Sequence, residues 1–218
     1  MNQQQFMAYV EGTMITLQLT FISVILGFIL AFFVAVMRMS KNKILKSISW
    51  VYVWVIRGTP MFLQILIAYF AVPIIYRNMT GQVLSNWSAF GAGVGALSLN
   101  TAAYTSEVIR SGIESIDKGQ WEAAQALGMT KAQAMLKVIA PQTLKRLIPP
   151  FSNELTTIMK DTSLISTIGI TELVKTSKGF AASGAIRFYF FCGAVYLVMT
   201  TLTTVFFDKV EKIAGKYE

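Results

Sequence analysis

The chain has 218 residues, of which 54% are hydrophobic and only 14% are charged, and this balance excludes an ordinary soluble domain. It contains no histidine and a single cysteine, Cys192, which excludes disulfide frameworks, Cys/His zinc sites and histidine-based catalytic triads. In so apolar a chain, the net charge of +8 indicates basic loops on one side of a membrane and no nucleic-acid partner.

Long uncharged runs predict most of the membrane spans. Because a helix rises about 1.5 Å per residue, about 20 apolar residues cross a bilayer. Runs of this kind predict spans at about 12–37, 58–76, 86–108 and 188–208. The segment 44–56 is apolar and aromatic but too short to span, so we interpret it as an interfacial helix that leads into the second span.

A fifth, polar span is predicted at about 149–160. It contains Glu154, and Pro149 with Pro150 interrupts any regular helix at its start. A short helix with polar residues suits a position shielded from lipid, followed by an irregular segment buried against the other helices. The sequence therefore predicts an all-α membrane protein, one domain over 1–218, with five transmembrane helices.

The lysines and arginines predict the orientation of these spans. With five spans and the N-terminus outside, 14 of the 19 basic residues fall on the inner side. Basic residues favour the cytoplasmic side, so we expect the N-terminus outside and the C-terminus inside. The connection between the third and fourth spans, about 111–140, then lies in the cytoplasm.

Two helix starts are predicted within this 111–140 loop. Asp117 with Gln120 and Thr130 with Gln133 have the spacing of capping boxes, in which each side chain satisfies a free backbone amide. Gly128 lies between the two helices and can adopt the left-handed conformation that ends the first, at 120–127. These residues leave two interpretations open: a plain surface loop, or a short helix that transmits force to a soluble partner.

Several motifs resemble the permease subunits of binding-protein-dependent ABC importers, and in particular their polar amino acid branch. Glu122-Ala123-Ala124, then Gly128, then Val138-Ile139-Ala140-Pro141 is similar to their EAA loop, with Ala140 in place of the usual leucine. Further similar motifs are Arg57-Gly58-Thr59-Pro60 with Gln64, Asn100-Thr101-Ala102-Ala103-Tyr104 with Glu107 and Arg110, and Asn153-Glu154 with Lys160-Asp161 and Ser163. The resemblance covers essentially the whole chain.

The resemblance implies a function and a set of partners. The chain would be half of a permease dimer in the bacterial cytoplasmic membrane, with an identical or homologous second permease. Two copies of an ATP-binding subunit and an extracytoplasmic amino-acid-binding protein would complete an importer that works by alternating access. In this family the EAA loop is a coupling helix that sits in a cleft of the ATPase, and Glu122, Ala123, Ala124 and Gly128 would fill that role.

The chain itself carries no motif for holding ATP. Gly179 and Gly184 are spaced as in a Walker A loop, but Ala185 and Ile186 follow where Lys and Ser/Thr are required. We therefore expect no enzymatic activity and no cofactor in this chain, with ATP and Mg²⁺ held by the partner ATPase.

Four residues are candidates for binding the solute, in the order Glu154, Asn100, Asp161 and Tyr104. A carboxylate within a span costs about 2.5–3.5 kcal/mol and usually faces the bundle interior, where it could pair with the ammonium group of an amino acid. In the resembled family, a site near mid-membrane draws on the third and fourth spans. A structural ion pair of Glu154 with Lys160 or Arg57, and simple helix packing of Asn100 and Tyr104, remain alternatives.

Two further alternatives concern function and assembly. An ion-coupled secondary transporter or channel could use Glu154 without any ATPase. Small residues, namely Gly91, Gly93 and Gly95 with Ala92 and Ala96, allow close helix approach on the third span. They would form either a dimer seam or, as we prefer, packing within one subunit.

Overall fold

The computed structural model describes residues 2–182 and 184–215, and all regular elements in these ranges are helices. The long helices are α1 (Gln3–Met39), α2 (Lys43–Arg57), α5 (Ala89–Glu114), α8 (Ala140–Asp161) and α10 (Arg187–Gly215). The short ones are α3 (Met61–Leu66), α4 (Val72–Thr80), α6 (Lys118–Ala126), α7 (Lys131–Ala134) and α9 (Leu173–Ala181). Residue 183, inside the glycine-spaced stretch 179–184, lies outside the described ranges.

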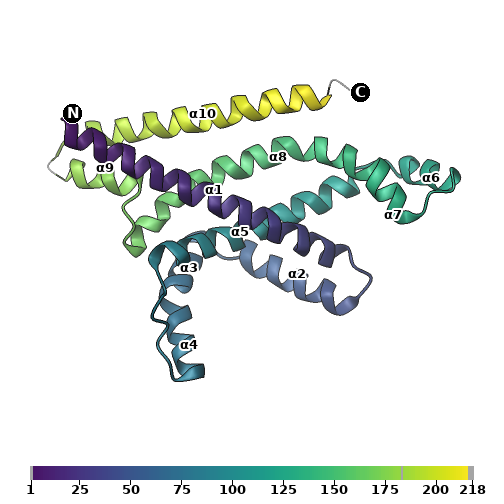
Figure 1. Cartoon of the computed structure of the whole chain (residues 1–218), viewed down its shortest axis with the longest axis horizontal. Helices are drawn as coiled ribbons and strands as arrows, with labels where there is room; N and C mark the ends of the chain where they lie inside the picture. The colour runs from purple at the N-terminus through teal and green to yellow at the C-terminus, as the bar shows by residue number, and fades with distance from the viewer. Residues whose placement is uncertain (1, 183, 216–218) are drawn as a thin grey trace.

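The helices α1, α5 and α10 run in one direction and α8 runs in the other (Figure 1). Two contacts fix the parallel register of α1 and α5: Gly27 faces Thr101, and further along both helices Arg38 pairs with Glu107. The start of α1 therefore lies at the opposite end of the molecule from the end of α10 (Figure 1). The short helices α6 and α7 lie at the end where α10 finishes.

Small residues allow α5 to pack closely within this chain. Gly93, Ala92 and Ala96 are all buried, and a Cβ added to Gly93 would lie 2.7 Å from Cδ1 of Ile165. Of the two roles predicted for the small-residue stripe, packing within one subunit is therefore confirmed for these three residues. A Cβ at Gly95 would meet nothing within 4 Å.

Replacing Gly27 with alanine is expected to destabilise the bundle by about 1–3 kcal/mol, because overpacking forces neighbours to shift. The new Cβ would lie 2.6 Å from Cβ of Thr101 and 3.1 Å from the Ser98 carbonyl oxygen. Thermal unfolding of the purified protein measures the effect. The matched control is Gly193→Ala on α10, where a Cβ meets nothing within 4 Å and alanine is the better helix former. Equal melting temperatures for Gly27→Ala and Gly193→Ala would contradict close α1–α5 packing.

The predicted second span is one continuous helix that begins at Met61, three residues later than predicted, and contains a π-helical turn. The segment 61–80 is helical throughout, through α3, a π-helical turn at Ile67–Ala71 and α4. It is one of three helices in the described ranges that are long and apolar enough to cross a membrane, with α1 and α10. The break at 58–60 separates it from α2, which lies against α1 and α5 and buries Ser49 and Val53.

The prediction that a helix begins at about residue 149, at the start of the polar span, was wrong. The helix α8 begins at Ala140 and continues through Pro149 and Pro150 to Asp161. Each proline removes one backbone hydrogen bond to the carbonyl four residues earlier, but burial of Leu147 and Leu155 against the bundle holds the helix together on both sides. The irregular buried segment predicted after this span is confirmed as a 3₁₀ turn, Thr162–Ile168, which buries Ile165.

A fully buried carboxylate begins α9. The Glu172 side chain has no exposed surface and accepts hydrogen bonds from the backbone N–H groups of Val174 (2.8 Å) and Lys175 (2.7 Å). These bonds satisfy amides at the start of α9, and the helix N-terminus favours the negative charge. Glu172 was not among the residues singled out from the sequence.

Candidate functional site

The 111–140 loop folds as two short helices joined at Gly128. The first, α6, is capped by Asp117, whose Oδ1 accepts the N–H of Gly119 at 2.7 Å. Gly128 has φ +78°, so the predicted left-handed turn is confirmed. The capping box of Thr130 and Gln133 is also confirmed at the start of α7.

The other predicted capping box does not form. The Gln120 side chain does not return to the backbone of Asp117, and its Oε1 accepts a hydrogen bond of 3.2 Å from Gln142 on α8. A tertiary partner has replaced the local one, and the interaction connects α6 to the start of α8.

The four residues of the EAA pattern differ in exposure. Glu122, Ala123 and Gly128 are exposed, whereas Ala124 is only 2% exposed. The small side chain of Ala124 faces inward, where α6 packs against the turn Met135–Ile139, and its role in coupling stays a prediction. Beside Gly128, Leu127 is 78% exposed, which gives this tip of the molecule an apolar side chain with no cover in the single chain.

Arg146 anchors the loop to α8. Its Nη1 donates to the carbonyl oxygen of Ser115 at 2.6 Å and to the Ser115 Oγ at 3.0 Å. Together with the Gln142–Gln120 bond, this gives the α6 end of the loop two polar connections to one helix. Of these, the Gln142–Gln120 bond connects α6 itself to α8, whereas the Arg146 bonds connect the end of α5 to α8.

A group of ion pairs closes the same end of the bundle. Arg38 Nη2 lies 2.6 Å from Glu107 Oε1, and Arg110 Nη2 lies 2.9 Å from Glu107 Oε2. Arg110 also pairs with Glu114. The side chains of Arg38 and Glu107 are each only 14% exposed, so this pair joins the ends of α1 and α5 more firmly than a surface pair would.

Glu154 and Asp161 lie seven residues apart on α8, which is two helical turns, so they share one side of the helix. Both are half-buried, at the edge of the face that packs Leu155 into the core. Among the described residues, neither carboxylate has a hydrogen bond or an ion pair, so the alternative ion pairs of Glu154 with Lys160 or Arg57 do not form.

Asn100 and Tyr104 come together with the break between α2 and α3. Asn100 Nδ2 donates to Gln64 Oε1 at 2.9 Å, and Gln64 Nε2 donates to the carbonyl oxygen of Ile56 at 2.7 Å. The guanidinium of Arg57 lies over the Tyr104 ring, 5.0 Å from its centroid. Within the described ranges, no hydrogen bond or ion pair joins this group to the acidic side of α8.

Sequence reasoning gave no role to Gln64, Glu107 or Arg146. Gln64 and Glu107 appeared only as letters of the resembled motifs, and their partners lie 36 and 69 residues away in sequence, at Asn100 and Arg38. No local spacing signals such contacts.

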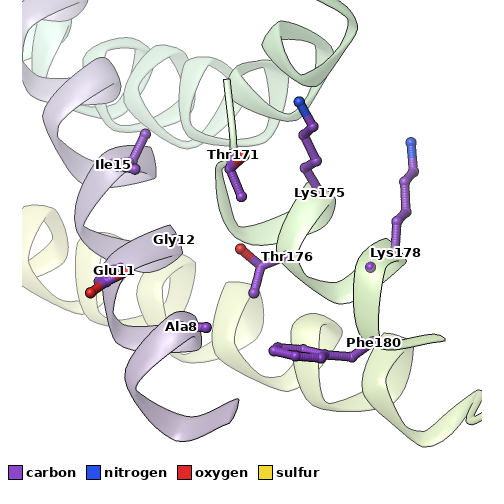
Figure 2. A pocket seen from close by; sticks show the side chains of 10 residues that line it. Ala8, Glu11, Gly12, Ile15, Thr171, Lys175, Thr176, Lys178 and Phe180 are labelled. Carbon is purple, nitrogen blue, oxygen red and sulfur yellow. The ribbon is translucent and has the colours of Figure 1, made fainter. Parts of the chain in front are cut away.

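A pocket opens at the end of the molecule that holds the start of α1 (Figure 2). It has a volume of about 650 Å³ and lies between α1 and α9. Figure 2 shows Lys175 and Lys178 projecting in the same direction from α9, with Phe180 at the other side of the opening. Glu11 adds a carboxylate from α1. The lining is therefore mostly apolar, with charged side chains at its edge, and the pocket lies opposite the 111–140 loop.

Comparisons with known proteins agree with this arrangement. Residues 11–213 match the family described as "Binding-protein-dependent transport system inner membrane component". A nopaline transport system permease of Agrobacterium fabrum (strain C58) is 39% identical over 191 residues, which cover 85% of this chain and 78% of that protein. An L-cystine transport system permease of Bacillus subtilis (strain 168) is 36% identical over 219 residues, covering 99% and 90%.

Solved structures show the same fold. The crystal structure of an amino acid ABC transporter with histidines has a chain that is 35% identical, with a TM-score of 0.86 and coverage of 96% of this chain and 95% of that one. The MetNI methionine ABC transporter, at 18% identity and a TM-score of 0.79, shares the fold. The family match extends over nearly the entire chain and includes the exposed helix α6 with its left-handed Gly128. The chain therefore belongs to the family of inner membrane components of binding-protein-dependent transport systems, the permease subunits of ABC importers.

Proposed function

We propose that this chain is the permease subunit through which an ABC importer moves a polar amino acid across the bacterial cytoplasmic membrane. The observation that carries the proposal is α6: an exposed helix with Glu122 on its surface, ended by Gly128 and joined to α8 by the hydrogen bond between Gln120 and Gln142. Permeases of this family leave ATP hydrolysis to a separate subunit. In our proposal this chain holds no cofactor, and ATP with Mg²⁺ is bound by the partner ATPase.

The proposed topology has five spans, with the N-terminus outside and the C-terminus in the cytoplasm. It is supported by the common direction of α1, α5 and α10 and the opposite direction of α8 (Figure 1). The same geometry puts α6 and the end of α10 at one end, which the basic residues assign to the cytoplasm. The pocket between α1 and α9 then faces outward, where a binding protein would deliver its solute.

The proposed assembly contains two permeases, identical or homologous, two ATP-binding subunits and one extracytoplasmic binding protein. Closure of the ATPases would move α6, and the hydrogen bond between Gln120 and Gln142 would transfer this movement to the start of α8. Because Glu154 also lies on α8, a movement of this helix would change the environment of the Glu154 carboxylate. This gives alternating access a continuous physical path from α6 to mid-membrane.

The proposed solute site combines two kinds of group. Glu154, with Asp161 behind it, would pair with the ammonium group, since no cation within the described ranges occupies either carboxylate. Asn100 donates one N–H of its amide to Gln64, and Oδ1 would accept a hydrogen bond from a solute. Tyr104, 37% exposed, would offer its ring.

Uptake by proteoliposomes that contain the purified permease, its co-purifying ATPase and the binding protein tests the function. We expect accumulation of a polar amino acid only with ATP and Mg²⁺ and with all three components present. Accumulation driven by a proton or sodium gradient, without ATP, would contradict the proposal and favour the ion-coupled transporter or channel that uses Glu154.

A further inference from the structure

A second cavity lies between α1, α2 and α5, near the end of the bundle that holds α6. Its volume is about 340 Å³, and its lining includes Arg38, Arg57 and Glu107 together with the indoles of Trp50 and Trp54. Arg38 lies in the last turn of α1 and Arg57 in the last turn of α2, so two helix ends each contribute one guanidinium. Neither the proposed solute site nor the coupling path uses this cavity.

The cavity carries more positive than negative charge. Its one carboxylate, Glu107, is already paired with Arg38 at 2.6 Å and with Arg110 at 2.9 Å. Arg57 is exposed and lies over Tyr104, and no carboxylate of the described chain is within salt-bridge distance of it. A planar guanidinium with unpaired N–H donors suits the oxygens of a phosphate group.

The surroundings of the cavity are those of a membrane interface. The rings of Trp50 and Trp54 are stacked, 5.9 Å apart with an interplanar angle of 4°, and both residues are more than half exposed at its rim. Beside them, α2 presents an exposed apolar stripe with helical spacing: Ile44 (70% exposed), Ile48 (55%), Val51 (49%) and Val55 (43%). Trp side chains are enriched where headgroups meet hydrocarbon, and the stripe offers a surface along which acyl chains can lie.

We propose that this cavity binds the phosphate of an anionic phospholipid from the leaflet nearest to α6. Arg57 is the main donor, Arg38 supports it from the opposite wall, and the acyl chains follow the apolar stripe of α2. Basic pockets between helices on the cytoplasmic side are suited to anionic headgroups. The choice of a lipid over a free anion comes from the stripe and the two indoles, which a soluble phosphate would not need. Bound lipid would hold α2 against the Arg38–Glu107 pair.

Native mass spectrometry of the purified permease–ATPase complex, titrated with phosphatidylglycerol or phosphatidylcholine, tests this site. We expect tighter binding of phosphatidylglycerol to the wild type, and about a fivefold loss of that affinity in Arg57→Gln, the effect of one basic residue near the bilayer surface. Arg57→Lys should keep most of the affinity. The matched control is Lys43→Gln, which removes an exposed charge at the other end of α2, outside the cavity, and should change nothing.

Three outcomes would overturn the proposal: unchanged phosphatidylglycerol affinity in Arg57→Gln, an equal loss in Lys43→Gln, or displacement of the lipid by excess inorganic phosphate, which would assign the cavity to a free anion. If Arg57→Gln does not yield an intact complex, Trp54→Ala serves in its place. It alters only the exposed rim, and an unchanged affinity in that variant would count against the site in the same way. Lipid binding is read without any uptake measurement, so its failure is distinct from failure of the transport function.

Discussion

Replacing Glu122 with lysine is expected to abolish ATP-driven uptake while leaving the permease inserted in the membrane. Glu122 is exposed on α6 and forms no ion pair with any described residue, so charge reversal is expected to leave the fold intact. Loss of a hydrogen-bonded charge pair that becomes buried at an interface costs about 2–5 kcal/mol, which is a loss of about 30-fold or more. Uptake by proteoliposomes and co-purification of the ATPase measure the two consequences.

The matched control for this variant is Glu211→Lys. Glu211 is also an exposed carboxylate, on the last part of α10 at the same end of the molecule, but it lies outside α6. It should retain normal uptake. Normal uptake by Glu122→Lys, or an equal loss in Glu211→Lys, would remove α6 as the point of contact with the ATPase.

Replacing Glu154 with glutamine should reduce uptake by about tenfold to a hundredfold, because a hydrogen bond to a charged group contributes about 1.5–3 kcal/mol. The substitution keeps the shape of the side chain and removes the charge that would pair with the ammonium group of the solute. ATP hydrolysis stimulated by the binding protein should persist, since the connection from α6 to α8 through Gln120 and Gln142 is unchanged. Measuring uptake and hydrolysis on the same preparation separates solute binding from coupling.

Lys160→Gln is the control for this second variant. Lys160 is exposed on the same helix and has no ion pair within the described ranges. Its loss should leave uptake unchanged. Wild-type uptake by Glu154→Gln at limiting solute concentration would reject Glu154 as the binding carboxylate and leave it a structural role.

The sequence predicted what depends on neighbours along the chain. The left-handed turn at Gly128 and the capping box of Thr130 with Gln133 follow from steric freedom and local hydrogen bonding, and both are confirmed. The box of Asp117 with Gln120 had the same spacing but did not form, because Gln142 on another helix competes for the Gln120 side chain. Local rules hold where no tertiary partner intervenes.

The features that the sequence could not predict depend on which helix faces pack against each other in the folded chain. Ala124 belongs to the same sequence motif as the exposed Glu122 and Ala123, but the turn after α7 buries its side chain. The prolines at 149 and 150 suggested a helix boundary, but packing of Leu147 carries α8 through them. Among the candidates for the solute site, Asn100 and Tyr104 contact Gln64 and Arg57 beside the α2–α3 break, and these long-range contacts have no local signal in the sequence.

The start of α1 and the end of α10 lie at opposite ends of the molecule (Figure 1). This placement restricts how copies of this protein can be joined. In the proposed five-span topology, a tandem gene that encodes two permeases as one polypeptide would begin its second copy on the other side of the membrane. Such a fusion would need an extra crossing segment between the halves to restore the polarity of the second copy. Two separate polypeptides avoid this requirement.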